Sequence, residues 1–222
     1  MDLSEYLPFW KTLSPEQRRL LEENAALRTV PAGTLLHNGD ADCVGLLLVE
    51  RGRLRAFILS EEGREVTLFR LLERDLCLFS ASCMMRGVQF DVSVESECES
   101  TYYAIPAERY HQVMTQSAAA ANFTNEIMAS RFSEVMWLVE QILNRHMDGR
   151  LAGLLVEESR LTGGGELKIT HDKLARHLGS AREVVTRTLR FLQSEGLIQL
   201  SRGSLRILDM AGLERLAGDS AR

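Results

Sequence analysis

The spacing of apolar residues predicts a chain that begins with a helix and continues as a β-structure. Ser14 can cap a short helix over 14–27, with Pro15 at its first position. Between 28 and 105, short apolar runs such as Gly45–Val49 are separated by turn residues. Turns at intervals of about 8–12 residues are typical of an antiparallel sandwich or barrel. Within this region Leu54, Ala56 and Ile58 alternate with Arg53, Arg55 and Phe57, as in a strand with one buried face.

From Pro106 onward the apolar period becomes helical. A short helix is expected over Ala107–Gln116, and a long one from about Ala118 to His146. The long helix carries a coiled-coil-like seam at steps of three and four: Met128, Phe132, Val135, Val139 and Ile142. Because apolar residues also lie off this seam, the helix must bury two sides. One side can cover the barrel and the other is expected to bind a partner; the alternative is a helix wholly buried in its own domain.

The C-terminal third predicts two short helices joined by a turn at Gly179-Ser180. Thr170 can cap the first helix and Ser180 the second, which would cover about 181–193. The small residue Ala175 lies where the helices would cross, as in a helix-turn-helix. A β-hairpin at 197–208 follows and would form the wing of a winged helix, while 146–149 is expected to be a hinge.

Polar side chains off the apolar stripe of the second helix are expected to contact DNA. Arg182 and Glu183 lie at the start of this helix, the part that enters the major groove in such motifs. Arginine can bond guanine O6 and N7 together, and glutamate accepts from cytosine N4. The full candidate set is Thr170, His171, Ser180, Arg182, Glu183, Thr186, Arg187, Arg190 and Arg202. The other interpretation is a solvated helix face carrying a Glu183–Arg187 pair.

Charge and composition favour the DNA-binding interpretation. The 222-residue chain has a net charge of -5, yet residues 147–222 hold 12 basic and 10 acidic side chains against 14 and 21 in residues 1–146. A locally basic part on an acidic body is expected where one part meets a polyanion. The acidic start and the absence of a long apolar run predict a cytoplasmic protein without a membrane partner. No nucleophile–base set or nucleotide loop is present, so we expect no enzyme activity.

The order of a β-roll, a long helix and a winged helix resembles the Crp/Fnr superfamily of bacterial transcription regulators. The most specific part is Ile169–Ile198 (ITHDKLARHLGSAREVVTRTLRFLQSEGLI), and Val49–Arg55 (VERGRLR) looks like the family's strand–Gly–strand turn. In the family, an Arg-Glu-x-x-x-Arg pattern reads TGTGA-like half-sites. Arg182, Glu183 and Arg187 occupy that pattern here.

The resemblance implies an α+β fold with three parts. An N-terminal double-stranded β-helix (a jelly-roll, cyclic-nucleotide-binding-like domain) would cover 1–117. A long dimerisation helix (118–146) would join it to a C-terminal winged helix-turn-helix (147–222). The implied assembly is a homodimer on roughly palindromic double-stranded DNA. An activating regulator also needs a surface for RNA polymerase, and no residue type in the sequence marks one.

The effector region departs from the family pattern. Cyclic-nucleotide-binding members carry a Gly-Glu pair and an Arg-Ser pair facing the phosphate. Asp75–Ser80 replaces the first, and no Arg-Ser pair follows in 81–93, so we expect no control by cyclic AMP. The oxygen-sensing branch has an N-terminal cysteine cluster, whereas the first cysteine here is Cys43. His37 and His111 lie outside a recognisable haem context. The cofactor, if there is one, stays unassigned.

Two thiols in the same stretch are the remaining candidates for a sensor. Cys77 and Cys83 enclose Phe79, Ser80 and Ser82, and these five residues are the candidate effector or redox site. The alternative is that the thiols fill the core or line a pocket for an unknown small molecule. No cysteine pair has the CxxC spacing of a zinc or iron–sulfur clamp. A metal centre held by Cys77 and Cys83, together with Cys43 or Cys98, is left open beside the redox hypothesis. The sequence thus predicts a regulator controlled by a small molecule or redox signal; the alternative is a constitutive dimeric DNA-binding protein with a degenerate, ligand-free sensory domain.

Overall fold

The computed structural model describes residues 3–38, 44–78 and 91–219. The chain forms two compact units: Met1–Leu59 with Leu68–Val135, and Ser60–Thr67 with Met136–Arg222. Each unit has its own hydrophobic core. In the part of the chain that is described, no helix has both the length and the apolar character needed to cross a bilayer.

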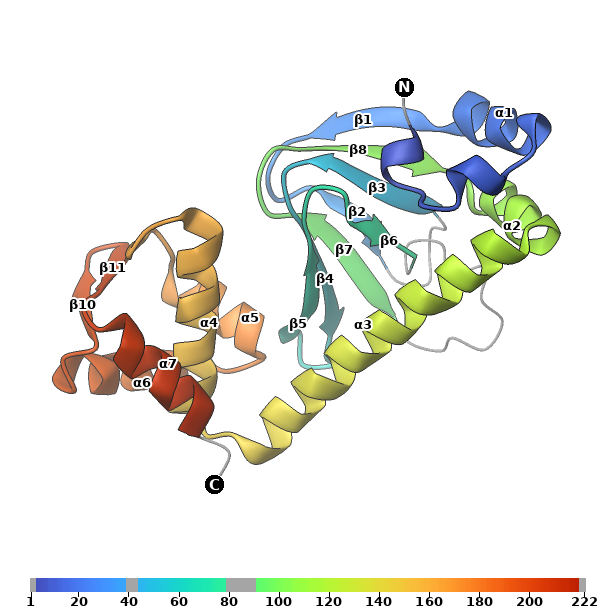
Figure 1. Ribbon diagram of the computed structural model, residues 1–222. Coiled ribbons are helices and arrows are strands. Elements are labelled where there is room, and N and C mark those ends of the chain that lie inside the picture. Colours follow the sequence, from blue (N-terminus) through green and yellow to red (C-terminus); the bar gives the residue numbers. More distant parts are fainter. Residues whose placement is uncertain (1–2, 39–43, 79–90, 220–222) are drawn as a thin grey trace. The chain divides into compact units, whose positions relative to one another are not determined.

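Two four-stranded antiparallel sheets form the β-roll (Figure 1). Their orders are β1-β8-β3-β6 and β2-β7-β4-β5. The strands are β1 (Ala26–Val30), β2 (Leu35–Asn38), β3 (Leu46–Arg51), β4 (Leu54–Leu59), β5 (Glu65–Leu71), β6 (Leu76–Cys77), β7 (Val92–Ser96) and β8 (Ser100–Ile105). Leu47, Val49, Leu54, Ala56 and Val94 bring buried side chains from both sheets into one core. The predicted sandwich or barrel is therefore confirmed.

Strand β4 departs from simple alternation. Leu54 and Ala56 are buried as expected, but Ile58 is exposed, and Arg55 and Phe57 are buried on the other side of the strand. The Arg55 guanidinium lies 4.3 Å from the centroid of the Phe57 ring and forms a 2.7 Å ion pair with Glu95 on β7. Register places Arg55 opposite Glu95, so a cross-strand carboxylate compensates the buried charge.

The β3–β4 turn depends on Gly52. Its φ of +98° lies in the region that favours glycine, and a Cβ there would approach the Glu99 carbonyl oxygen to 2.7 Å. The Val49–Arg55 motif therefore has a steric reason for its glycine.

The N-terminal helices pack on the roll. They are the 3-10 helices η1 (Leu3–Glu5) and η2 (Trp10–Thr12) and helix α1 (Pro15–Asn24). Ser14 caps α1 in a capping box with Gln17, as the sequence indicates. The predicted end of this helix at residue 27 is wrong. Leu27 lies in β1 opposite Tyr103 of β8, because ladder pairing at the sheet edge replaces the last helical turn.

Two further helices follow the last strand of the roll. Helix α2 (Ala107–Gln116) matches its predicted range, and α3 (Ala118–Asn144) is the predicted long helix. Met128 on α3 packs against both cores of the first unit. Arg131 lies 4.7 Å from the centroid of the Phe69 ring and forms a 2.9 Å ion pair with Glu134. One side of α3 thus covers the roll.

Within the second unit, residues 147–219 form a winged helix-turn-helix, and the sequence did not predict its third wing strand or its last helix. Its elements are α4 (Met147–Thr162), β9 (Glu166–Leu167), α5 (His171–Leu178), α6 (Arg182–Ser194), β10 (Ile198–Ser201), β11 (Ser204–Ile207) and α7 (Met210–Asp219). Strand β9 adds a third strand to the wing, and α7 packs on α4. Helix α4 already begins at Met147, so the predicted hinge at 146–149 is wrong in part. Gly149 lies buried within α4, and only Arg145 and His146 separate α3 from α4.

Candidate nucleic-acid interface

The turn between α5 and α6 is built from local hydrogen bonds. Thr170 caps α5, because its Oγ1 accepts a hydrogen bond from the Lys173 amide at 3.1 Å. Gly179 ends α5 with a φ of +63°, and the Ser180 amide donates to the Ala175 carbonyl at 3.0 Å. The expectation that Ser180 caps α6 is wrong. Ala181 occupies that position without a side-chain cap, since the tight turn places Ser180 one residue too early.

Helix α6 has one buried face and one exposed face. Val185, Leu189 and Leu192 are fully buried in the core of the unit. Leu174, Ala175 and Leu178 of α5 pack in the same core. The opposite face of α6 exposes Arg182, Glu183, Arg187 and Arg190. Burial of one stripe fixes the rotation of the helix and therefore orients this basic face outward.

Two side chains at the start of α5 contact the exposed side of α6. The Nδ1 atom of His171 and the Oγ1 atom of Thr186 are 2.8 Å apart and share a hydrogen bond. Asp172 forms a 3.5 Å ion pair with Nη1 of Arg182. Within the described residues Glu183 and Arg187 form no ion pair, so the alternative of an intrahelical pair is not what the structure contains.

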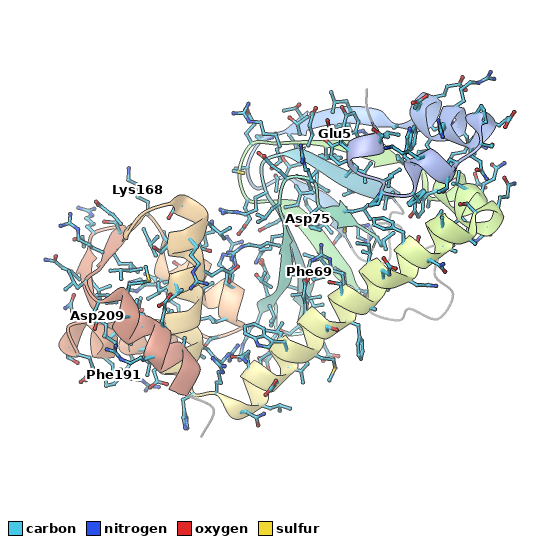
Figure 2. The ribbon with its side chains drawn as sticks, in the orientation of Figure 1. Glu5, Phe69, Asp75, Lys168, Phe191 and Asp209 are labelled. Carbon is cyan, nitrogen blue, oxygen red and sulfur yellow. The ribbon has the colours of Figure 1, made fainter. Side chains whose placement is uncertain are left out.

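The wing follows α6 in the chain and carries a further arginine. Arg202 and Gly203 form the turn between β10 and β11, and Gly203 has a φ of +78°. Arg202 is exposed at this turn. Lys168, labelled in Figure 2, is also exposed and directly precedes the Ile169-Thr170 cap.

Arg150 joins α4 to the helix-turn-helix. Its Nη2 donates to the Leu178 carbonyl at 2.7 Å, which satisfies an otherwise open carbonyl at the C-terminal end of α5. Burial lowers the pKa of Arg150 from its usual value. A cation at a helix C-terminus is favourable, so this contact holds α5 in place.

Comparison with known proteins identifies the architecture. A family model of the Crp-like helix-turn-helix domain matches residues 149–216. A crystal structure of a protein assigned to the Crp/Fnr family of transcriptional regulators, from Eubacterium rectale, shares 52% sequence identity and a TM-score of 0.94. The match covers 96% of this chain and 99% of that one. This chain belongs to the Crp/Fnr family of transcription regulators.

More distant relatives agree over most of the chain. The cyclic AMP receptor protein of Thermus thermophilus is 26% identical over 211 residues, which is 95% of this chain and 96% of that protein. The Crp/Fnr-family regulator TTHA1359 of the same organism shares the fold, with a TM-score of 0.71 at 23% identity, covering 87% of this chain and 98% of that one. The Crp/Fnr resemblance and the α+β fold class expected from the sequence are both confirmed.

In this Crp/Fnr protein the candidate effector residues are only partly described. Phe79, Ser80, Ser82 and Cys83 lie outside the described residues. Cys77 ends β6 and is 1% exposed within the core of the roll. His37 is buried and His111 exposed. Among the residues that the structure places, no group of three or more His, Cys, Asp or Glu side chains could hold a metal ion.

The candidate dimerisation residues divide into two groups. Phe132, Val139 and Ile142 are 66%, 39% and 43% exposed. Met128 and Val135 are half-buried, and Met128 packs against the roll. Three more large apolar side chains of α3 are exposed as well: Met136, Trp137 and Leu143. The C-terminal half of α3 therefore presents an apolar surface that this single chain leaves uncovered.

Proposed function

We propose that this chain is a dimeric, sequence-specific DNA-binding regulator that reads a roughly palindromic operator with α6. The observation that carries the proposal is the amphipathic division of α6. A buried stripe fixes the helix in its unit, and the exposed arginines lie on the other side. In helix-turn-helix proteins the second helix lies in the major groove, with its N-terminal residues against base edges.

The candidate residues divide into those assigned to base edges and those assigned to phosphates. Arg182 and Glu183 occupy the first turn of α6 and Arg187 the second, so these three are assigned to guanine and cytosine edges. The phosphate contacts are assigned to Thr170, His171, Ser180, Thr186, Arg190 and, from the wing, Arg202. Exposure of the arginines supports this assignment, because a guanidinium engaged inside the protein would be lost to DNA.

The assignment is tested with Arg182→Ala. A preferred duplex is first selected from a randomised pool with the wild-type protein, and a scrambled duplex of the same composition serves as reference. Loss of about 1–3 kcal/mol on the preferred duplex alone is expected for a base-reading arginine. Equal weakening on both duplexes would reduce Arg182 to a phosphate contact and contradict the proposal.

Dimerisation through α3 is the second part of the proposal. The exposed apolar residues of its C-terminal half support it, because such a surface is stabilised by burial against a partner. A second copy places two recognition helices about 34 Å apart, one turn of DNA. A Phe132→Asp/Val139→Asp variant is expected to sediment as a monomer and to lose operator binding. Ser130→Asp, an exposed position off the seam, is the control. A dimer that persists in the double variant would overturn this part.

Control by a small molecule or redox signal other than cyclic AMP is the third part. The missing Arg-Ser pair supports the exclusion of cyclic AMP. Arg131 gives a physical route, because it connects α3 to the Phe69 ring and lies 3.9 Å from Asp75 at the edge of the effector region. A constitutive regulator is the second candidate, favoured by the burial of Cys77 in the core.

Operator binding measured under several conditions separates these candidates. Redox control is supported if the operator affinity stays the same with cyclic AMP, changes on treatment with peroxide and is restored by dithiothreitol. Affinity that responds to none of these additions in the purified protein, with no small molecule found by native mass spectrometry, supports the constitutive candidate. A large increase with cyclic AMP contradicts the third part.

A further inference from the structure

The arginine assigned to base reading already has an acidic partner within the protein. Asp172, the second residue of α5, lies 3.5 Å from Nη1 of Arg182, the first residue of α6. One turn further along α6, Thr186 shares a hydrogen bond with His171. The adjacent residues His171 and Asp172 of α5 therefore contact Thr186 and Arg182, which are four residues apart and lie on the same face of α6.

The Asp172–Arg182 pair is loose enough to change on DNA binding. Both side chains are about 60% exposed, at 61% for Arg182 and 62% for Asp172, and an exposed ion pair of this kind is weak. A guanidinium has five N–H donors, and the Asp172 carboxylate approaches Nη1 at 3.5 Å, which is longer than a close charge-assisted hydrogen bond. Arg182 can therefore bond guanine O6 and N7 with its remaining donors while Asp172 still fixes its orientation.

A phosphate differs from a guanine base edge in its negative charge. A phosphate that takes Arg182 as a counter-ion brings its negative charge towards the Asp172 carboxylate, and this repulsion opposes binding. Non-specific affinity rests almost entirely on such contacts with the DNA backbone. Asp172 is thus expected to weaken non-specific complexes while it supports the specific one.

We propose that Asp172 is a specificity-determining residue, which positions Arg182 for a base edge and penalises its use on the DNA backbone. The proposal rests on the proposed base-reading function of Arg182. His171 supports the same geometry, because its bond to Thr186 keeps the first turn of α5 against the second turn of α6.

The test compares full-length wild type with Asp172→Asn on the selected duplex and the scrambled duplex. Glu195→Gln, an exposed position at the C-terminal end of α6, changes the net charge equally and is the matched control. For Asp172→Asn we expect about two- to fivefold tighter binding to the scrambled duplex, with equal or weaker binding to the selected one. The ratio of the two affinities then falls, whereas in Glu195→Gln it stays within about twofold.

A double-mutant cycle with Arg182→Ala separates the two levels of the proposal. The change in affinity ratio caused by Asp172→Asn is expected to disappear in the Arg182→Ala background. If Arg182→Ala leaves the ratio unchanged, the base-reading function itself fails. If Arg182→Ala lowers the ratio but Asp172→Asn raises both affinities equally, base reading stands and Asp172 is merely a repulsive charge, which overturns this inference.

Discussion

The arginines of the β-roll and those of the recognition helix are chemically identical, but their surroundings differ. Arg53 and Arg70 both reach Glu97, whose side chain is 2% exposed, and Arg55 pairs with Glu95. Arg187 and Arg190 lie exposed on α6. A buried guanidinium must be paired because desolvation of its charge is costly, whereas an exposed one stays hydrated until an anion arrives.

The difference teaches that acidic partners decide what an arginine can do. Arg70 places Nε 2.9 Å from one carboxylate oxygen of Glu97 and Nη2 3.3 Å from the other, which is the bidentate arrangement. Such an arginine holds a sheet together and is not available to DNA. Arg182 is intermediate between the paired arginines of the roll and the exposed arginines of α6, because it has one exposed acidic neighbour at 3.5 Å.

The largest effect is expected where two arginines share one buried anion, Glu97; the Arg53 and Arg70 side chains are 17% and 6% exposed. Glu97→Gln removes the negative charge between Arg53 and Arg70 and is expected to lower the free energy of unfolding by about 3–5 kcal/mol. Urea unfolding of the full chain, followed by tryptophan fluorescence, measures the loss. A change below about 1 kcal/mol would mean that these buried arginines are no more dependent on a partner than exposed ones.

An intermediate effect is expected on the DNA-facing side. Arg187→Ala is predicted to weaken the selected duplex by about 1–3 kcal/mol, since Arg187 is assigned to a base edge. Its urea midpoint is expected to remain that of wild type, because the side chain is exposed. Fluorescence anisotropy with selected and scrambled duplexes gives the first quantity. A large loss of stability would instead give Arg187 a structural role like that of Arg70.

A smaller effect is expected one turn further along α6. Arg190→Ala is predicted to weaken both duplexes alike and to reduce the slope of log K against log salt by about 0.9 per operator half-site. The measurement is a salt titration between low and physiological ionic strength. A loss confined to the selected duplex would move Arg190 from the phosphate contacts to the base contacts.

The smallest effect is expected for an exposed ion pair of the β4–β5 hairpin. Glu62 and Arg64 lie 2.7 Å apart, but their side chains are 71% and 57% exposed. Glu62→Gln is predicted to change the free energy of unfolding by less than about 1 kcal/mol. This variant is also the control for Glu97→Gln, since both remove one carboxylate charge from a Glu–Arg pair. Equal losses in the two variants would show that burial is not what separates the two kinds of pair.

Much of the candidate interface could be predicted because its signals are local. The Thr170 cap, the Gly179 turn and the apolar stripe of α6 all lie within about 25 consecutive residues. Helix caps and amphipathic periods act over one or two turns, so most of their pattern in the sequence survives in the structure; the Ser180 cap is the exception. The same locality explains the correct ranges of α2 and nearly all of α3.

The misplaced elements share a non-local cause. Leu27 leaves the predicted helix because Tyr103, 76 positions later, pairs with it in the sheet. Strand β9 forms because it pairs with β11. It is only two residues long, which is too short to show an alternating pattern of apolar and polar residues. The burial of Arg55 depends on the register that brings Glu95 opposite, which alternation along one strand cannot reveal.

The sequence by itself determined the order of the main elements, the helix-turn-helix with its two-stranded wing and the set of side chains on the outer face of α6, because periodicity and capping are properties of neighbouring residues. Only the tertiary structure decided which charges are paired: Arg53 and Arg70 with Glu97, and Arg182 with Asp172. Ion pairs form between residues that folding brings together, and their strength depends on burial, which no single segment specifies.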